Sequence, residues 1–293
     1  MKKLIISCDD LGISKEVNLG IKDCLQKKAA TSTSIIANGK FYDHALENVV
    51  TTNTQSGYGL HLNLTEGKAL NKNSLDILCD KNNDFKISAP NFFLLNLYGV
   101  NNNLKKAVYE ELKSQIQKVL KDGIQLSHLD SHEHIHQAPW VFKIIADLGK
   151  EFKINKIRFV NEKIVLRNYF KNFFHKVKSL NYFKHLLINT YKIRIKNDLL
   201  SPDYFFGILN SGNIKKDEFF YFLKKIQSNA TIELCIHPAN QTESEDTFNL
   251  EKKYRNFYSN KNRTYEKNFL LSDEFTDFIK RENIKLISFL DLN

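Results

Sequence analysis

The sequence predicts an α/β fold, namely a TIM-like (β/α) barrel that is seven-stranded or irregular. Short runs rich in Ile, Leu and Val alternate along the 293 residues with longer segments of helical periodicity. This alternation is typical of a parallel sheet with crossover helices. Polar side chains follow the strand candidates at their carboxyl ends, where parallel α/β folds assemble their functional sites.

Seven segments have the length and composition of strands, and Tyr204–Gly207 is an eighth, weaker candidate. The seven are Leu4–Cys8, Ser34–Ala37, Gly59–Leu64, Gln125–Leu129, Lys156–Val160, Thr231–Ile236 and Lys285–Phe289. Seven or eight strands favour a closed or nearly closed barrel over a wound sheet of four or five strands.

Five segments between these strands have helical periodicity. They are Lys15–Lys28, Leu104–Asp122, Pro139–Lys150, Lys215–Ser228 and Ser272–Glu282. Ser14 is the expected N-cap of the first helix, and Gly123 is the expected residue just after the second. Asn71–Asn83 and Thr242–Asn268 are expected to be long surface loops or insertions.

We expect residues 1–293 to form a single barrel domain with a helical insertion at about 163–200. Apolar side chains recur there at near-helical spacing, and we expect one or two amphipathic helices that cap the pocket or contact another subunit. These side chains are Leu166, Phe170, Phe173, Val177, Leu180, Phe183 and Leu187. We expect this stripe to pack in the core.

The net charge of +10 is concentrated in this insertion, because Lys163 to Lys196 contains nine Lys or Arg residues and no Asp or Glu. We interpret the charge as a solvated helical face, and we expect no nucleic-acid partner. Peripheral binding to a membrane surface is the alternative.

The sequence shows neither a secretory signal pattern nor an apolar stretch long enough to span a membrane. Asp9 and Asp10 end the first apolar run too early for the core of a signal peptide. The four cysteines are scattered without CxxC spacing, which is typical of reduced thiols. We therefore expect a cytoplasmic protein.

The densest group of potential metal ligands is His128-Leu129-Asp130-Ser131-His132-Glu133-His134-Ile135-His136, which holds four of the nine histidines. Imidazole is the commonest side-chain ligand of Zn²⁺ and similar ions, and carboxylates complete mixed sites. On an extended segment His132, His134 and His136 would face the same way. We expect a metal to take only His132.

Asp9 and Asp10 follow the first strand, and two adjacent carboxylates are costly to bury without a cation or a proton. Alone they would be interpreted as a helix cap and a solvated acid. Beside a His-rich strand end, Asp10 is the expected ligand, since neighbouring strand residues point apart. Asp9 is then free to take a proton from a water that the metal activates.

His61 and His237 complete the predicted site. An inward-facing histidine such as His61 is either a satisfied core residue or a ligand, and the other candidates favour a ligand. His237 follows the strand Thr231–Ile236, and Pro238 restricts the backbone there. We expect His237 to act as an acid toward the leaving amine, or to hydrogen-bond the developing oxyanion.

Several motifs in this order resemble the YdjC-type carbohydrate deacetylases, which include the chitooligosaccharide deacetylases. They are Asp9-Asp10-Leu11-Gly12, Thr33-Ser34 with Asn38-Gly39, Gly59-Leu60-His61-Leu62-Asn63-Leu64-Thr65, the segment His128 to His136, and Glu233-Leu234-Cys235-Ile236-His237-Pro238. The resemblance spans residues 1 to about 240. It implies a TIM-like barrel, a single divalent metal, hydrolysis of an acetamido sugar, and a homodimer.

By position, the resemblance implies that Asp10, His61 and His132 bind the metal. It implies that Asp9 is the catalytic base and His237 the acid. The resemblance also implies that Arg158 orients Asp9 or the substrate. Mg or Zn is the expected metal, with Mn, Co and Ni as alternatives.

The chain departs from the family pattern at Ala239, where the family usually has Gly, and in its basic segment. Both departures concern the shape of the substrate. Two other functions are consistent with the residues alone. One is a metal-dependent phosphoesterase with two ions, and the other is a catalytically silent protein that binds a sugar or a polyanion.

Overall fold

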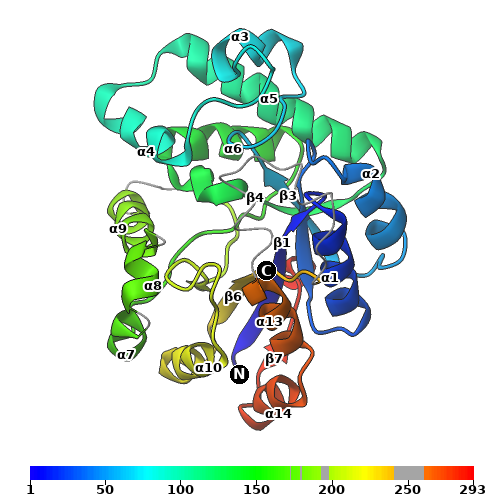
Figure 1. Ribbon diagram of the computed structural model, residues 1–293, viewed down its shortest axis with the longest axis vertical. Helices are drawn as coiled ribbons and strands as arrows, with labels where there is room; N and C mark the ends of the chain where they lie inside the picture. Colours follow the sequence, from blue (N-terminus) through cyan, green and yellow to red (C-terminus); the bar gives the residue numbers. More distant parts are fainter. Residues whose placement is uncertain (172, 179, 193–197, 241–260) are drawn as a thin grey trace.

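The computed structural model describes residues 1–171, 173–178, 180–192, 198–240 and 261–293, and its centre is one curled parallel sheet (Figure 1). Its strands, within those ranges, are β1 (Lys3–Leu11), β2 (Ser32–Ile35), β3 (Gly57–Leu62), β4 (Leu126–Ser131), β5 (Tyr204–Phe206), β6 (Thr231–Ile236) and β7 (Lys285–Leu286). They are ordered β4-β3-β2-β1-β6-β5, and β7 also pairs with β1. The predicted α/β fold with a parallel sheet is confirmed, and its curvature is consistent with a TIM-like barrel.

The predicted strand Lys156–Val160 is replaced by isolated parallel bridges. Ile157 bridges Leu129 in β4, and Glu162 bridges Phe205 in β5. This segment therefore lies between the two edge strands of the sheet, which brings Arg158 to the interior of the curl.

All five predicted helices are present as α1 (Lys15–Gln26), α5 (Asn102–Lys121), α6 (Pro139–Glu151), α10 (Lys216–Lys225) and α14 (Asp273–Arg281). Ser14 caps α1 by accepting a hydrogen bond from the Val17 amide. Gly123 follows α5 with φ +84°, a conformation that glycine adopts without strain. Both capping predictions are confirmed.

Further helices were not predicted. They are α2 (Tyr42–Ala45), α3 (Leu75–Leu78), α4 (Ala89–Tyr98) and α13 (Lys261–Leu270), with single turns at Leu46–Val50, Lys72–Ser74, His132–Gln137 and Phe289–Asp291. The loop prediction is wrong for 75–78 and for 261–268. In α13 the buried face begins with two charged residues, Arg263 and Glu266, which conceals its periodicity. Residues 242–260 lie outside the described part of the chain.

The basic segment folds as α7 (Leu166–Phe170), α8 (Phe173–Lys178) and α9 (Asn181–Lys192) along one side of the molecule (Figure 1). The expectation that its apolar stripe packs in the core is wrong. Six of the seven stripe residues are about half exposed or more, and only Leu187 packs partly against the core. The division into one domain with an insertion stays a prediction. None of the helices described could span a membrane.

The strand β1 shows how the sheet positions the site. Every residue from Leu4 to Leu11 is buried, because one face packs on helices and the other lines the interior of the curl. Ile5 lies on the interior face and belongs to a small apolar cluster that also contains Phe289. Ser7 and Asp9 continue the same face, since alternate strand residues point the same way. The interior thus changes from apolar to charged toward the carboxyl ends.

The His128 ring fills a gap in β3 where Gly59 has no side chain. The ring stacks on Phe289 with 3.6 Å between centroids, and burial lowers its pKa to about 3. A Cβ on Gly59 would lie only 2.3 Å from this ring. His128 is therefore a neutral core residue, and Gly59 provides the space that it fills.

We predict that Gly59→Ala destabilises the fold by about 1–3 kcal/mol, because the added methyl overpacks the His128 ring. Urea unfolding measures this cost. In the double variant with His128→Ala the methyl gains space, so most of the penalty should disappear. An equal penalty in both backgrounds would show that the His128 contact is not its cause.

Candidate active site

A pocket of about 320 Å³ lies at the carboxyl ends of the strands. Five of the six predicted site residues line it, namely Asp9, Asp10, His61, His132 and His237. They come from β1, β3, the end of β4 and the end of β6, so the sheet brings together residues more than 220 positions apart in sequence. The sixth, Arg158, is fully buried and lies against Asp9.

Both Asp9 and Asp10 reach this pocket because β1 is irregular at its end. The register with β2 shifts between Cys8 and Leu11, and Asp10 has φ 71°. A left-handed residue breaks the alternation of side chains along a strand. The expectation that one of the two carboxylates must point elsewhere is therefore wrong.

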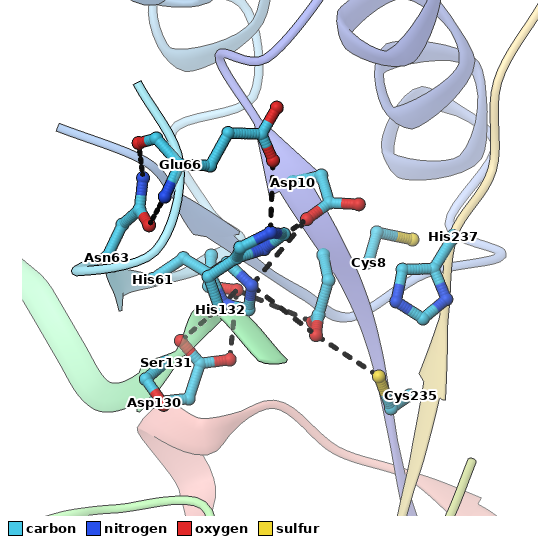
Figure 2. Close-up of polar contacts among 12 residues, drawn as sticks. Cys8, Asp10, His61, Asn63, Glu66, Asp130, Ser131, His132, Cys235 and His237 are labelled. Atoms are coloured by element: carbon cyan, nitrogen blue, oxygen red, sulfur yellow. Dashed lines mark hydrogen bonds and ion pairs between the residues drawn. The ribbon is translucent and has the colours of Figure 1, made fainter. Parts of the chain in front are cut away.

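Asp10, His61 and His132 turn potential ligand atoms toward one another (Figure 2). Asp10 Oδ1 lies 3.6 Å from His61 Nε2 and 3.3 Å from His132 Nδ1. The three ligand atoms all lie within 4.8 Å of one another, and all three residues are buried. Two imidazoles and a carboxylate form a donor set that fits Zn²⁺ and several other divalent ions.

Each of these imidazoles has a carboxylate at its other nitrogen (Figure 2). Asp130 Oδ1 lies 3.0 Å from His61 Nδ1, and Glu66 Oε2 lies 3.2 Å from His132 Nε2. Such outer carboxylates fix the tautomer and orientation of histidines that ligate metals. Neither acid has a role predicted from the sequence. Asp130 lies within the motif, but nothing in the sequence pairs Glu66 with His132.

The charge around these histidines also suits a cation. Burial alone would lower the pKa of His61 and His132, yet neighbouring carboxylates raise the pKa of both above the ordinary value. Asp130 is the largest such influence on His61, and Asp10 on His132. The pocket therefore favours positive charge at the position between Asp10 and the two imidazoles.

The other histidines of the cluster have different surroundings, because the segment His132–Gln137 is a tight helical turn. Glu133 and His134 have positive φ values of 52° and 58°. The extended geometry assumed from the sequence is wrong here. His136 contacts Ser131 Oγ through Nδ1 at 2.6 Å, and His134 lines the pocket with its ring edge-on to Phe205.

Arg158 holds Asp9 in place. Its Nη1 and Nη2 donate to the two carboxylate oxygens of Asp9 at 2.6 and 2.7 Å, and it also pairs with Asp130 and Glu233 at 2.8 Å. Burial alone would raise the pKa of Asp9, but the Arg158 guanidinium lowers it well below its usual range. Of the two roles expected for Arg158, this geometry supports the orientation of Asp9.

Arg263 in α13 makes a similar contact with Asp10, and sequence analysis missed it. Its Nη2 lies 2.6 Å from Asp10 Oδ2, and its Nε donates to the His237 carbonyl oxygen at 3.1 Å. Asp10 Oδ1 thus faces the histidines while Oδ2 is held by a guanidinium. The Arg-x-x-Glu spacing of Arg263 and Glu266 was the available signal, but that stretch was interpreted as a loop.

His237 lies at the end of β6 and is nearly buried. Glu266 accepts a hydrogen bond from its backbone N–H at 2.9 Å, which fixes the turn where the ring emerges. Burial lowers the pKa of His237 to about 4. Ala239 is buried, and its backbone would lie 2.5 Å from a Cβ on Gly20 of α1. This turn is therefore closely packed against α1.

Comparison with known proteins identifies relatives over the full length. A carbohydrate deacetylase of Clostridium beijerinckii is 27% identical over 290 residues, covering 99% of this chain and 100% of the relative. Carbohydrate deacetylase 1 of Listeria innocua is 26% identical and covers 99% and 100%. A carbohydrate deacetylase of Xenopus laevis is 25% identical over 99% of this chain and 98% of its own.

A solved structure shares the fold. The putative cellobiose-phosphate cleavage protein of Enterococcus faecalis superposes with a TM-score of 0.73 at 21% identity, covering 98% of this chain and 97% of that one. The family model described as YdjC-like protein matches residues 3–281. The resemblance seen in the motifs is thereby confirmed, and the chain belongs to the YdjC-like protein family.

Proposed function

We propose that this protein is a metal-dependent hydrolase that removes an N-acetyl group from an amino sugar and releases acetate. One observation supports this most: Asp10, His61 and His132 converge in a pocket beside a second carboxylate, Asp9, which an arginine orients. The full-length relatives named carbohydrate deacetylase support the reaction class.

One divalent ion would be held by Asp10, His61 and His132, with Asp130 and Glu66 orienting the imidazoles. Mg or Zn is proposed first, with Mn, Co and Ni as alternatives. Such an ion polarises an acetyl carbonyl and acidifies water in its coordination sphere.

Asp9 would accept the proton of the attacking water. Its carboxylate is ionised because Arg158 lowers its pKa, and Oδ2 lies 4.0 Å from His61 Nε2, so it is close to the ligand set without belonging to it. Arg158 occupies both oxygens of Asp9 with short hydrogen bonds. We propose that this contact keeps Asp9 deprotonated, as a proton acceptor must be, and disfavours its use as a ligand.

His237 would face the reacting acetamide from the end of β6. Its imidazole is neutral in the structure, since burial lowers its pKa to about 4, and a neutral ring still carries one N–H. That N–H can hydrogen-bond the developing oxyanion, whereas His237 would first have to take up a proton to act as an acid toward the leaving amine. The main-chain bonds to Glu266 and Arg263 hold the ring in position for either role.

The alternative phosphoesterase requires a second ion. Within the described ranges, the other groups able to hold an ion are Asp9, Cys235 and His237, and Asp9, His61 and Asp130. Both depend on Asp9, whose two carboxylate oxygens Arg158 already holds. A single-ion deacetylase therefore fits the charges better. The homodimer and the cytoplasmic location expected from the sequence stay predictions.

We predict that His132→Ala abolishes stoichiometric metal binding, because only two of the three proposed ligands remain. Metal content after dialysis, measured by inductively coupled plasma mass spectrometry, tests this. His44→Ala removes an imidazole from α2, away from the pocket, and should retain the metal. Full metal occupancy in His132→Ala would refute the ligand assignment.

We predict that Asp9→Asn retains the metal while acetate release falls by about 10²–10⁴-fold, the usual contribution of a general base. The assay measures acetate from a panel of N-acetylated sugars, including chitobiose, glycolipid headgroups and nucleotide sugars, with and without divalent metal. Asp277→Asn, an exposed carboxylate of α14, is the control. Normal turnover by Asp9→Asn would exclude it as the base.

If wild-type protein with bound metal releases no acetate from any sugar, the deacetylase proposal fails. Turnover of a generic phosphate ester with two ions per chain would instead support the phosphoesterase.

A further inference from the structure

The helices α7 to α9 bury polar side chains on the side that faces the sheet. Lys176 is buried and pairs with the buried Glu218 of α10 at 3.2 Å. Asn181 donates to the carbonyl oxygens of Leu209 and Ser211 at 3.2 Å. His185 Nε2 lies 3.3 Å from the Glu162 carbonyl oxygen. The segment is thus attached to the barrel through these polar contacts and through the apolar side chains of Ile188 and Tyr191, which are buried in the core.

The same helices also carry exposed apolar side chains. We call this set the apolar face and define it by Leu166, Phe170, Phe174, Leu180, Phe183 and Leu186, which are 50–86% exposed. A helix on the surface of a soluble protein usually has the reverse arrangement, with polar residues outward. Large exposed apolar side chains that are concentrated in one segment mark surfaces that a partner protein or a membrane covers.

Charge indicates what covers the apolar face. The surrounding segment from Lys163 to Lys196 has nine cationic residues and no acidic one. Of these, Lys171 and Lys176 form ion pairs with the barrel, to Asp217 and Glu218. A second copy docking symmetrically would place this positive segment against itself, which is repulsive. An anionic bilayer offers both negative headgroups and an apolar layer.

We propose that the apolar face of α7 to α9 docks this protein onto the surface of an anionic lipid bilayer. Aromatic and leucine side chains would enter the boundary between headgroups and acyl chains, while lysines and arginines contact lipid phosphates. The helix α9 also contributes Lys184 to the pocket lining, between Phe183 and Leu186 of the apolar face. Docking would therefore bring the pocket close to the headgroups.

The test is co-sedimentation of the full chain with vesicles of equimolar phosphatidylglycerol and phosphatidylcholine, and with vesicles of phosphatidylcholine alone. We expect binding to the anionic vesicles, weakened at high salt by screening. The variant Leu166→Ser/Phe174→Ser removes the two most exposed apolar side chains of the face. Its partition coefficient should be at least about tenfold lower, because buried apolar area drives insertion.

The matched control is Leu120→Ser/Leu290→Ser, which removes two exposed leucines elsewhere and should bind vesicles like the wild type. Thermal unfolding verifies that each variant is folded. If the first variant unfolds, Lys163→Glu, which reverses an exposed charge of the segment, should weaken binding to anionic vesicles in its place.

Equal sedimentation of wild type with both vesicle types, or none with either, overturns the proposal. So does a dimer in light scattering that only the Leu166→Ser/Phe174→Ser variant disrupts, since a second copy would then cover the face. These outcomes are independent of acetate release, so the docking proposal and the deacetylase proposal fail separately.

Discussion

The site depends on the ion pairs that the buried guanidinium of Arg158 forms with three carboxylates. The guanidinium pairs with Asp9, Asp130 and Glu233 in the interior of the curled sheet, where unpaired carboxylates would be very costly. Its partners then orient other groups, because Asp130 contacts His61 through Nδ1. Loss of one partner from such a network typically costs about 3–5 kcal/mol. Arg158 thus links the stability of the fold to the geometry of the proposed metal site.

A second guanidinium extends this arrangement to the other side of the pocket. Arg263 holds Asp10 by one oxygen and contacts the His237 carbonyl oxygen, so one side chain from α13 connects β1 with the end of β6. The two adjacent carboxylates of β1 therefore have different partners. Asp9 is held at both oxygens by Arg158, whereas Asp10 keeps Oδ1 toward the histidines. This difference supports different roles for two chemically identical groups.

Most strands and the main pocket residues were predictable because both follow local rules. Apolar runs of strand length recur along the chain, and parallel strands place their carboxyl ends at one edge. The positions of Glu66 and Arg263 were not predictable, since each depends on a contact with a residue distant in sequence. The apolar stripe of α7 to α9 was misinterpreted because periodicity alone identifies an apolar side of a helix without showing what faces it.

The central claim is that one divalent ion lies among Asp10, His61 and His132. Anomalous diffraction from crystals of this protein grown with Zn²⁺ or Mn²⁺, recorded at the absorption edge of the metal, tests it most directly. We predict a single anomalous peak within bonding distance of one oxygen of Asp10, of His61 Nε2 and of His132 Nδ1. A peak among Asp9, Cys235 and His237, or two peaks in the pocket, would contradict it.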